Sequence, residues 1–323
     1  MAEIKKYKVT EPYLDLHCSL GEGPFWEQDR NTLRFVDIEK KQVHFVDLTK
    51  GPSSHRKLDL DFSIGTTANI EHNENEFIFG GKLGYGIMNR ETGESRWIKM
   101  VWTDEERKPD AGGKPGVGKN KEERMRSNDG AVDAHGRYFV GNMNDQELVG
   151  SNFTDEGILF RLDPDLSLHR VKDTITIPNG ISWTNDNKYI YFTDSPTGKI
   201  RKYPYDLSTG IISWDSGVDF FTCPYPNGVP DGHTQDEEGC LWIALHGTGK
   251  VVRVNTEGEI IAEVELPTRC VTCPAFCGTS LFITTAAEMQ PEKHPWSVKY
   301  QGGLFKVDVN IRGRLPHEFR MKV

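Results

Sequence analysis

The sequence lacks three features that mark large classes of protein. No stretch of its 323 residues approaches 18 consecutive apolar residues, and no apolar run follows the charged start, so we expect neither a membrane span nor a secretory signal. The 39 Lys and Arg residues are outnumbered by 48 Asp and Glu, a formal charge of −9, which argues against a nucleic-acid platform. Six cysteines are too few to hold a scaffold of this size by disulfides. We therefore expect a cytoplasmic protein without nucleic-acid or membrane partners, a monomer or a weak homo-oligomer.

Long segments with a 3.6-residue apolar period are also scarce, whereas short β-rich runs bounded by Gly, Asp, Asn and Thr recur along the whole chain. This pattern predicts a mostly β fold. The six strongest runs are Leu33–Asp37, Glu76–Gly80, Arg137–Gly141, Tyr189–Thr193, Cys240–Ala244 and Ser280–Thr284. They recur roughly every 40–60 residues, as the blades of a propeller do, and a further strand follows each of them.

We predict an all-β fold, a six-bladed β-propeller with a central metal site. One domain is expected over residues 1–323, because a blade buries only part of its surface and needs neighbours on both sides. A loop insertion at about 103–125 explains the longest interval, and we consider it as a lid over the channel. The terminal segments Lys8–Cys18 and Pro316–Val323 are expected to pair within one blade and close the ring.

Polar residues recur at one phase of the repeat, before four of the strongest runs. Each is an acid or amide with a glycine one or two residues after it: Glu22, Asn128, Asn179 and Asp231. Because the innermost strand of every blade lines the channel, residues at the same position of each repeat are predicted to lie close together near the axis. A single Asp-Gly or Asn-Gly pair is more often a turn, but four in phase favour a shared site.

Glu22, Asn179 and Asp231 together offer two carboxylates and one amide oxygen. This set suits a hard divalent cation and leaves coordination positions open for water and substrate. Such a cation polarises a carbonyl and lowers the pKa of a bound water, while one carboxylate is available as a general base.

Four ordered motifs resemble those of the senescence-marker protein/gluconolactonase/luciferin-regenerating-enzyme family: Ser19–Trp26 (SLGEGPFW), Arg126–Gly130 (RSNDG), Pro178–Trp183 (PNGISW) and Pro230–Gly232 (PDG). The resemblance runs from about residue 15 to about residue 310. It implies a six-bladed propeller that hydrolyses lactones with one divalent metal ion (Ca²⁺, Mg²⁺, Mn²⁺, Zn²⁺ or Fe²⁺). The family's metal ligands match Glu22, Asn179 and Asp231.

The same resemblance implies that Arg126 and Asn128 contact substrate hydroxyls. The acidic pair that follows in sugar lactonases is replaced here by a different sequence, in which Asp145 or Gln146 takes that role. The expected mechanism opens an aldonolactone to the aldonic acid: a metal-polarised carbonyl is attacked by water, with Asp231 as general base.

Two alternatives to a sugar-lactone hydrolase stay open at this point. The first is a scaffold propeller that binds a divalent cation without catalysis. The second is a hydrolase of aryl lactones or phosphotriesters on the same fold. The polar pair Arg126 and Asn128 favours a small-molecule sugar lactone as the partner.

Overall fold

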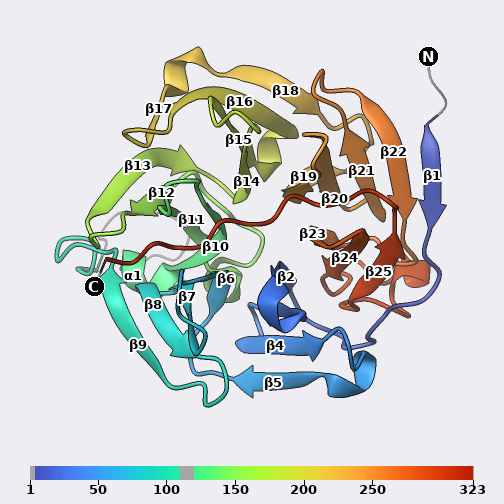
Figure 1. Ribbon diagram of the computed structural model, residues 1–323, viewed down its shortest axis with the longest axis horizontal. Helices are drawn as coiled ribbons and strands as arrows, with labels where there is room; N and C mark the ends of the chain where they lie inside the picture. The colour runs from blue at the N-terminus through green and yellow to red at the C-terminus, as the bar shows by residue number, and fades with distance from the viewer. Residues whose placement is uncertain (1–3, 110–119, 323) are drawn as a thin grey trace.

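Six sheets of mainly antiparallel strands surround one axis in the computed structural model, which describes residues 4–109 and 120–322 (Figure 1). The innermost strands of the six blades contact one another in a closed ring. They are β2 (Gly21–Glu27), β6 (Ile64–Asn69), β10 (Met125–Val132), β14 (Pro178–Trp183), β19 (Val229–Gln235) and β23 (Val271–Cys277). The prediction of a six-bladed, all-β propeller is confirmed.

The six strongest sequence runs form the second strand of each blade. These strands are β3 (Thr32–Asp37), β7 (Glu76–Gly81), β11 (Tyr138–Asn144), β15 (Tyr189–Asp194), β20 (Leu241–His246) and β24 (Ser280–Thr285). Each packs between two neighbouring blades and is therefore buried on both faces. That is why the run Phe77, Ile78 and Phe79, with all three side chains fully buried, is continuously apolar instead of alternating.

The third and outer strands complete the blades. The third strands are β4 (Gln42–Asp47), β8 (Gly84–Asn89), β12 (Gly157–Leu162), β16 (Lys199–Asp206), β21 (Lys250–Val254) and β25 (Phe305–Asp308). The outer strands are β5 (Arg56–Asp59), β9 (Ser95–Met100), β13 (Leu168–Ile175), β17 (Ile211–Ile212), β18 (Val218–Thr222) and β22 (Ile260–Glu265). The blade of β23 has three strands.

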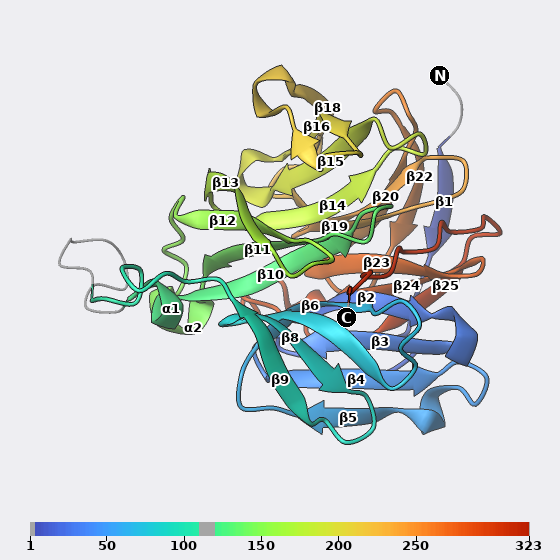
Figure 2. The same ribbon diagram turned by 60° about the vertical axis from the view of Figure 1, so that its left-hand side comes forward.

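The short helices lie in the connections. They are α1 (Lys121–Arg124), α2 (Gln146–Val149), η1 (Gln28–Arg30), η2 (Pro52–Ser54), η3 (Ser195–Thr197), η4 (Trp214–Ser216) and η5 (Pro295–Ser297). Figure 2 places α1 and α2 side by side at one end of the channel. None of the helices in the described part of the chain has the length and apolar character that crossing a bilayer requires.

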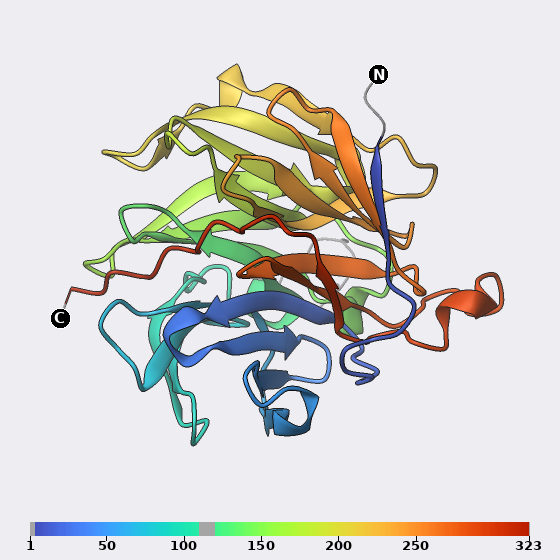
Figure 3. The ribbon, with the colours of Figure 1, turned by 45° about the vertical axis from the view of Figure 1, so that its right-hand side comes forward.

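The two ends of the chain attach to different blades, so the predicted pairing of both ends within one blade is wrong. Strand β1 (Lys5–Lys8) runs parallel to β22, and Leu14 forms an antiparallel bridge with Leu304 (Figure 3). The C-terminal segment instead crosses the channel (Figure 1) and Phe319 bridges to Ile70. Phe319 is fully buried in the core between the blades of β6 and β10. Burial of this apolar side chain stabilises the C-terminal segment in its position.

The single-domain and lid predictions are not tested by this architecture. The expected insertion at 103–125 lies between β9 and β10 and ends in α1. Residues 110–119 of that segment lie outside the described residues, so the lid hypothesis stays a prediction.

Candidate functional site

Every innermost strand carries a β-bulge at the same position, close to its start. The strand register shifts between Glu22 and Phe25 in β2, between Asn179 and Ile181 in β14, and between Pro230 and His233 in β19. The same irregularity occurs in β6, β10 and β23. A bulge turns a side chain out of the regular alternation, so six bulges at one level direct six segments of chain toward the axis.

The Asp-Gly and Asn-Gly pairs are therefore parts of strands and not turns between them. At Gly180 a Cβ atom would lie 2.2 Å from the Nδ1 atom of His233, and at Gly232 it would lie 2.4 Å from the Sγ atom of Cys273. Only glycine fits where the inner strands approach one another this closely.

Glu22, Asn179 and Asp231 line one cavity of about 370 Å³ at the end of the channel near α2; we call it the mouth cavity. Arg126, Asn128 and Gln146 lie on its wall as well. Six of the seven residues expected at the site from sequence thus share a single cavity.

Asp145 is the predicted site residue that does not line the mouth cavity. Its carboxylate pairs with the Nζ atom of Lys82 and accepts a hydrogen bond from the backbone N–H of Glu147, at the start of α2. The charge of Asp145 still acts on Arg126, since it favours the protonated guanidinium.

The carboxylates of Glu22 and Asp231 are buried without a cationic partner among their described hydrogen bonds. Glu22 is 5% exposed and accepts a bond from the N–H of Gly23 at 3.0 Å, while the buried Oδ1 atom of Asp231 has no hydrogen-bond partner in the described residues. Desolvation raises the pKa of both groups well above its ordinary value; for Glu22 the negative charge of Asp231 adds to the rise, and for Asp231 that of Asp129 does.

An unpaired buried carboxylate costs several kcal/mol unless a cation compensates it. Two such groups and an amide oxygen on one wall fit a hard divalent cation. Among residues 4–109 and 120–322, no group of three or more His, Cys, Asp and Glu side chains is placed to hold a metal ion. The predicted site therefore depends on a mixed set, with the amide of Asn179 as its third member.

Arg126 is buried beside these acidic groups. Its Nη1 atom donates to the Oδ1 atom of Asn128 at 2.8 Å and to the carbonyl of Ser127 at 2.9 Å. Burial lowers its pKa, whereas Asp145, Glu39, Glu22 and Asp231 oppose that change. Arginine has five N–H donors, so Arg126 can hold Asn128 and still donate to a ligand in the mouth cavity.

Several further residues of the mouth cavity were not placed in the candidate site from the sequence. Glu39, Ser195, His246 and Glu288 line it, and all four lie at or just after the end of a second strand. Glu288 accepts two hydrogen bonds from Arg269, which hold its pKa at about 2, whereas burial lowers the pKa of His246 to about 4. Their common place in the repeat is a signal that could have identified them.

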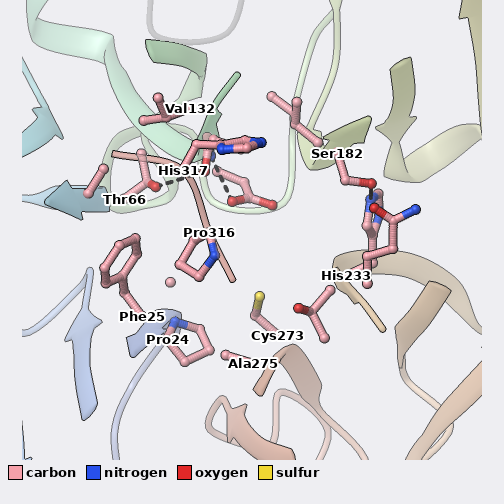
Figure 4. A pocket seen from close by; sticks show the side chains of 18 of the residues that line it. Pro24, Phe25, Thr66, Val132, Ser182, His233, Cys273, Ala275, Pro316 and His317 are labelled. Carbon is pink, nitrogen blue, oxygen red and sulfur yellow. Dashed lines mark hydrogen bonds between the residues drawn. The ribbon is translucent and has the colours of Figure 1, made fainter. Parts of the chain in front are cut away.

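A second cavity of about 160 Å³ (Figure 4) is lined by residues within the bulges or after them along the innermost strands, such as Phe25, Ile181 and Ala275. Pro316 and His317 of the C-terminal segment cover it, and Cys273 and His233 lie on its wall. The Nε2 atom of His233 is 2.7 Å from the hydroxyl of Ser182. Glu22, Asn179 and Asp231 do not line this cavity, so we place the candidate site in the mouth cavity.

The fold and the mouth cavity define a six-bladed propeller whose channel opens on a wall of buried side chains that carry oxygen atoms. The family model described as "SMP-30/Gluconolactonase/LRE-like region" matches residues 20–287. The chain belongs to this family, and the resemblance found in the sequence is confirmed.

Relatives from distant organisms match almost the full length of the chain. Pentonolactonase XacC of Haloferax volcanii is 31% identical over 317 residues, which cover 96% of this chain and 97% of that protein. Regucalcin of Homo sapiens is 29% identical over 329 residues and covers 99% of both chains. A crystal structure of the calcium-binding protein regucalcin from Agrobacterium tumefaciens matches with a TM-score of 0.82 at 23% identity, over 98% of this chain and 99% of that one, which supports the fold.

Proposed function

We propose that this protein is a divalent-cation-dependent hydrolase that opens sugar lactones to their aldonic acids. One observation carries the proposal: the buried Oδ1 atom of Asp231, which has no hydrogen-bond partner among the described residues, lies in the same cavity as Glu22, Asn179 and Arg126. Two buried carboxylates without a hydrogen bond from a cationic side chain among the described residues call for a cation, and a buried guanidinium beside them suits an oxygen-rich substrate. Family membership and the similarity to a pentonolactonase support the same reaction class.

Glu22, Asn179 and Asp231 would hold the cation, which supplies a Lewis acid and lowers the pKa of water when it is bound. Asp231 accepts a proton as water attacks the lactone carbonyl carbon. Arg126 donates hydrogen bonds to the carbonyl oxygen as negative charge develops on it. The bond from the carbonyl carbon to the ring oxygen then breaks, and the proton from Asp231 passes to that oxygen to give the hydroxy acid.

Arg126, Asn128 and Gln146 are proposed to select the substrate through its hydroxyl groups. Gln146 lies on the wall of the mouth cavity at the start of α2 and is partly exposed, so its amide can meet a substrate directly. Asp145, whose carboxylate is bonded to Lys82, is proposed to act through the charge of Arg126.

The second candidate function is hydrolysis of aryl lactones or phosphotriesters. It is favoured by the apolar part of the same wall, which includes Met143, Phe153 and Met289. Met289 is 57% exposed, and a large exposed apolar side chain at the rim of a cavity is typical of a binding surface.

The test uses metal-stripped protein resupplied separately with Ca²⁺, Mg²⁺, Mn²⁺, Fe²⁺ and Zn²⁺. Acid release is measured with a panel of five- and six-carbon aldonolactones, an aryl lactone and a phosphotriester. We expect metal-dependent release from an aldonolactone, its loss in Asp231→Ala, and its retention in Glu91→Ala, a control whose side chain is 68% exposed.

Two outcomes would contradict the proposal. Metal-dependent turnover of only the aryl lactone or the phosphotriester would favour the second candidate. The absence of metal-dependent turnover across the whole panel, in protein that binds a cation, would favour the scaffold alternative.

A further inference from the structure

A chain of four hydrogen bonds crosses three blades beside the candidate metal ligands. The Nη1 atom of Arg126 donates to Asn128 Oδ1 at 2.8 Å, and Asn128 Nδ2 donates to Asn179 Oδ1 at 2.9 Å. Asn179 Nδ2 donates to Ser195 Oγ at 2.9 Å, and Ser195 Oγ donates to the carbonyl of Pro230 at 2.7 Å. All four side chains are buried, with exposures of 3 to 6%. The last hydrogen bond of the series is accepted by Pro230, the residue before Asp231.

The two ends of this chain have fixed polarity. A guanidinium can only donate hydrogen bonds, whereas a backbone carbonyl can only accept them. Asn128 must therefore present its oxygen to Arg126, and its amide nitrogen then faces Asn179. Asn179 must in turn present its oxygen to Asn128 and its nitrogen to Ser195. The hydroxyl of Ser195 accepts that bond and donates its own proton to Pro230.

Only this set of orientations pairs every donor with an acceptor. If the amide of Asn179 were reversed, its nitrogen would face the nitrogen of Asn128, and two buried donors would oppose each other. Leaving a buried polar group unsatisfied costs about 1–3 kcal/mol. Such a cost keeps one orientation of the amide dominant, because about 1.4 kcal/mol already corresponds to a tenfold ratio of populations.

We propose that Ser195 and Asn128 are positioning residues that hold the Asn179 amide with its oxygen available to a divalent cation. This inference rests on the proposed function, because it assigns Asn179 as a ligand. An amide oxygen has two lone pairs; the bond from Asn128 uses one, and the second is free. Reversal of the amide would offer the cation an N–H donor instead, which cannot ligate it.

Ser195 is well placed for this role. It begins η3, directly after β15, and its backbone N–H donates to the carbonyl of Ile177 at 3.1 Å. Its hydroxyl therefore sits on a fixed backbone and joins Asn179 on β14 to the peptide that precedes Asp231 on β19. Loss of this hydroxyl removes the acceptor that specifies the nitrogen end of Asn179.

The experiment measures the dissociation constant of the cation in metal-stripped protein by calorimetric titration with Ca²⁺, Mg²⁺, Mn²⁺, Fe²⁺ and Zn²⁺. We expect Ser195→Ala to weaken the tightest of these about 10–100-fold, as is typical when a residue that orients a metal ligand is removed. Ser195→Thr keeps the hydroxyl and should restore most of the affinity. Circular dichroism and thermal unfolding of the stripped proteins monitor the fold.

Thr193→Val is the matched control. Thr193 pairs directly with Asn179 across the two strands and is fully buried, and its hydroxyl has no hydrogen-bond partner among the described residues. Its removal should change the affinity by less than about threefold, within the usual error of additivity.

The decisive comparison repeats Ser195→Ala in an Asn179→Asp background. A carboxylate offers oxygen from both ends, so its orientation no longer matters, and the effect of Ser195→Ala should fall below about threefold. Equal weakening in both backgrounds, or no weakening in either, would overturn the positioning role and leave the proposed function standing. If the wild-type protein bound none of the five cations, the positioning inference and the proposed function would both be overturned.

Discussion

Asp129 is a partly buried carboxylate whose charge destabilises the folded protein, so Asp129→Asn should stabilise the metal-stripped form at neutral and alkaline pH. Asp129 lines the cavity under the C-terminal segment and accepts a hydrogen bond from the N–H of Gly130 at 2.7 Å. Desolvation raises its pKa from 3.8 to about 6. A rise of this size corresponds to about 3 kcal/mol of lost stability once the group is ionised in both states.

The sign of the pH dependence follows from the raised pKa. The folded state holds the proton of Asp129 more tightly than the unfolded state does, so the wild-type protein loses stability as pH rises from about 4 through about 6. The Asp129→Asn variant has no carboxyl at this position and does not lose stability in this way. Its stability relative to the wild type should therefore grow by about 2.5 kcal/mol between pH 4 and pH 8. With an unfolding entropy of about 0.7 kcal/mol/K for a chain of this length, the relative Tm should rise by about 4 °C.

Differential scanning calorimetry of the metal-stripped proteins at several pH values between 4 and 8 measures this difference. A constant cost of the substitution, such as a weaker hydrogen bond to Gly130, cancels because only the change with pH is compared. Asp104→Asn, at an exposed position, controls for the loss of one negative charge. A Tm difference between variant and wild type that stays the same from pH 4 to pH 8 would refute the reasoning.

Two further changes probe the C-terminal segment and the substrate contacts. Because Phe319 is fully buried, Phe319→Ala should lower the free energy of unfolding by about 3–5 kcal/mol. The Tm should fall by about 4–7 °C. An unchanged Tm would show that the C-terminal segment does not contribute to stability. Arg126→Lys should reduce kcat/KM for an aldonolactone about 10–100-fold, since an ammonium cannot bond Asn128 and the substrate with the same planar geometry. Arg96→Lys on the outer strand β9 should leave it unchanged.

The number of blades could be predicted because the second strands are buried on both faces. Strands such as Glu76–Gly81 are continuously apolar for that reason, and their recurrence shows the repeat directly. The path of the C-terminal segment could not be predicted. Phe319 packs against a strand near the start of the chain, and no periodic pattern in the last residues indicates such a partner.

The sequence shows that Glu22, Asn179 and Asp231 occupy the same position in their repeats. It does not show that a β-bulge in each innermost strand places them there. Asn-Gly and Asp-Gly pairs occur both in turns and at bulges, since both need a residue without a side chain. Ser195 was missed for a similar reason. The segment that follows β15 is composed of serine, proline, threonine and glycine, which is typical of a surface turn, although Ser195 itself is buried.

Antiparallel pairing explains why two distant parts of each repeat supply one site. The start of each innermost strand lies opposite the end of its second strand, as Asn179 lies opposite Thr193 and Glu22 opposite Val36. The bulges thus provide the candidate ligands at the axis, and the segments that leave the second strands provide the surrounding wall, including Ser195 and Gln146. Bulge residues are fixed by close packing between strands, whereas the exit segments vary in length without disturbing the ring. The candidate ligands should therefore tolerate fewer substitutions than the surrounding wall.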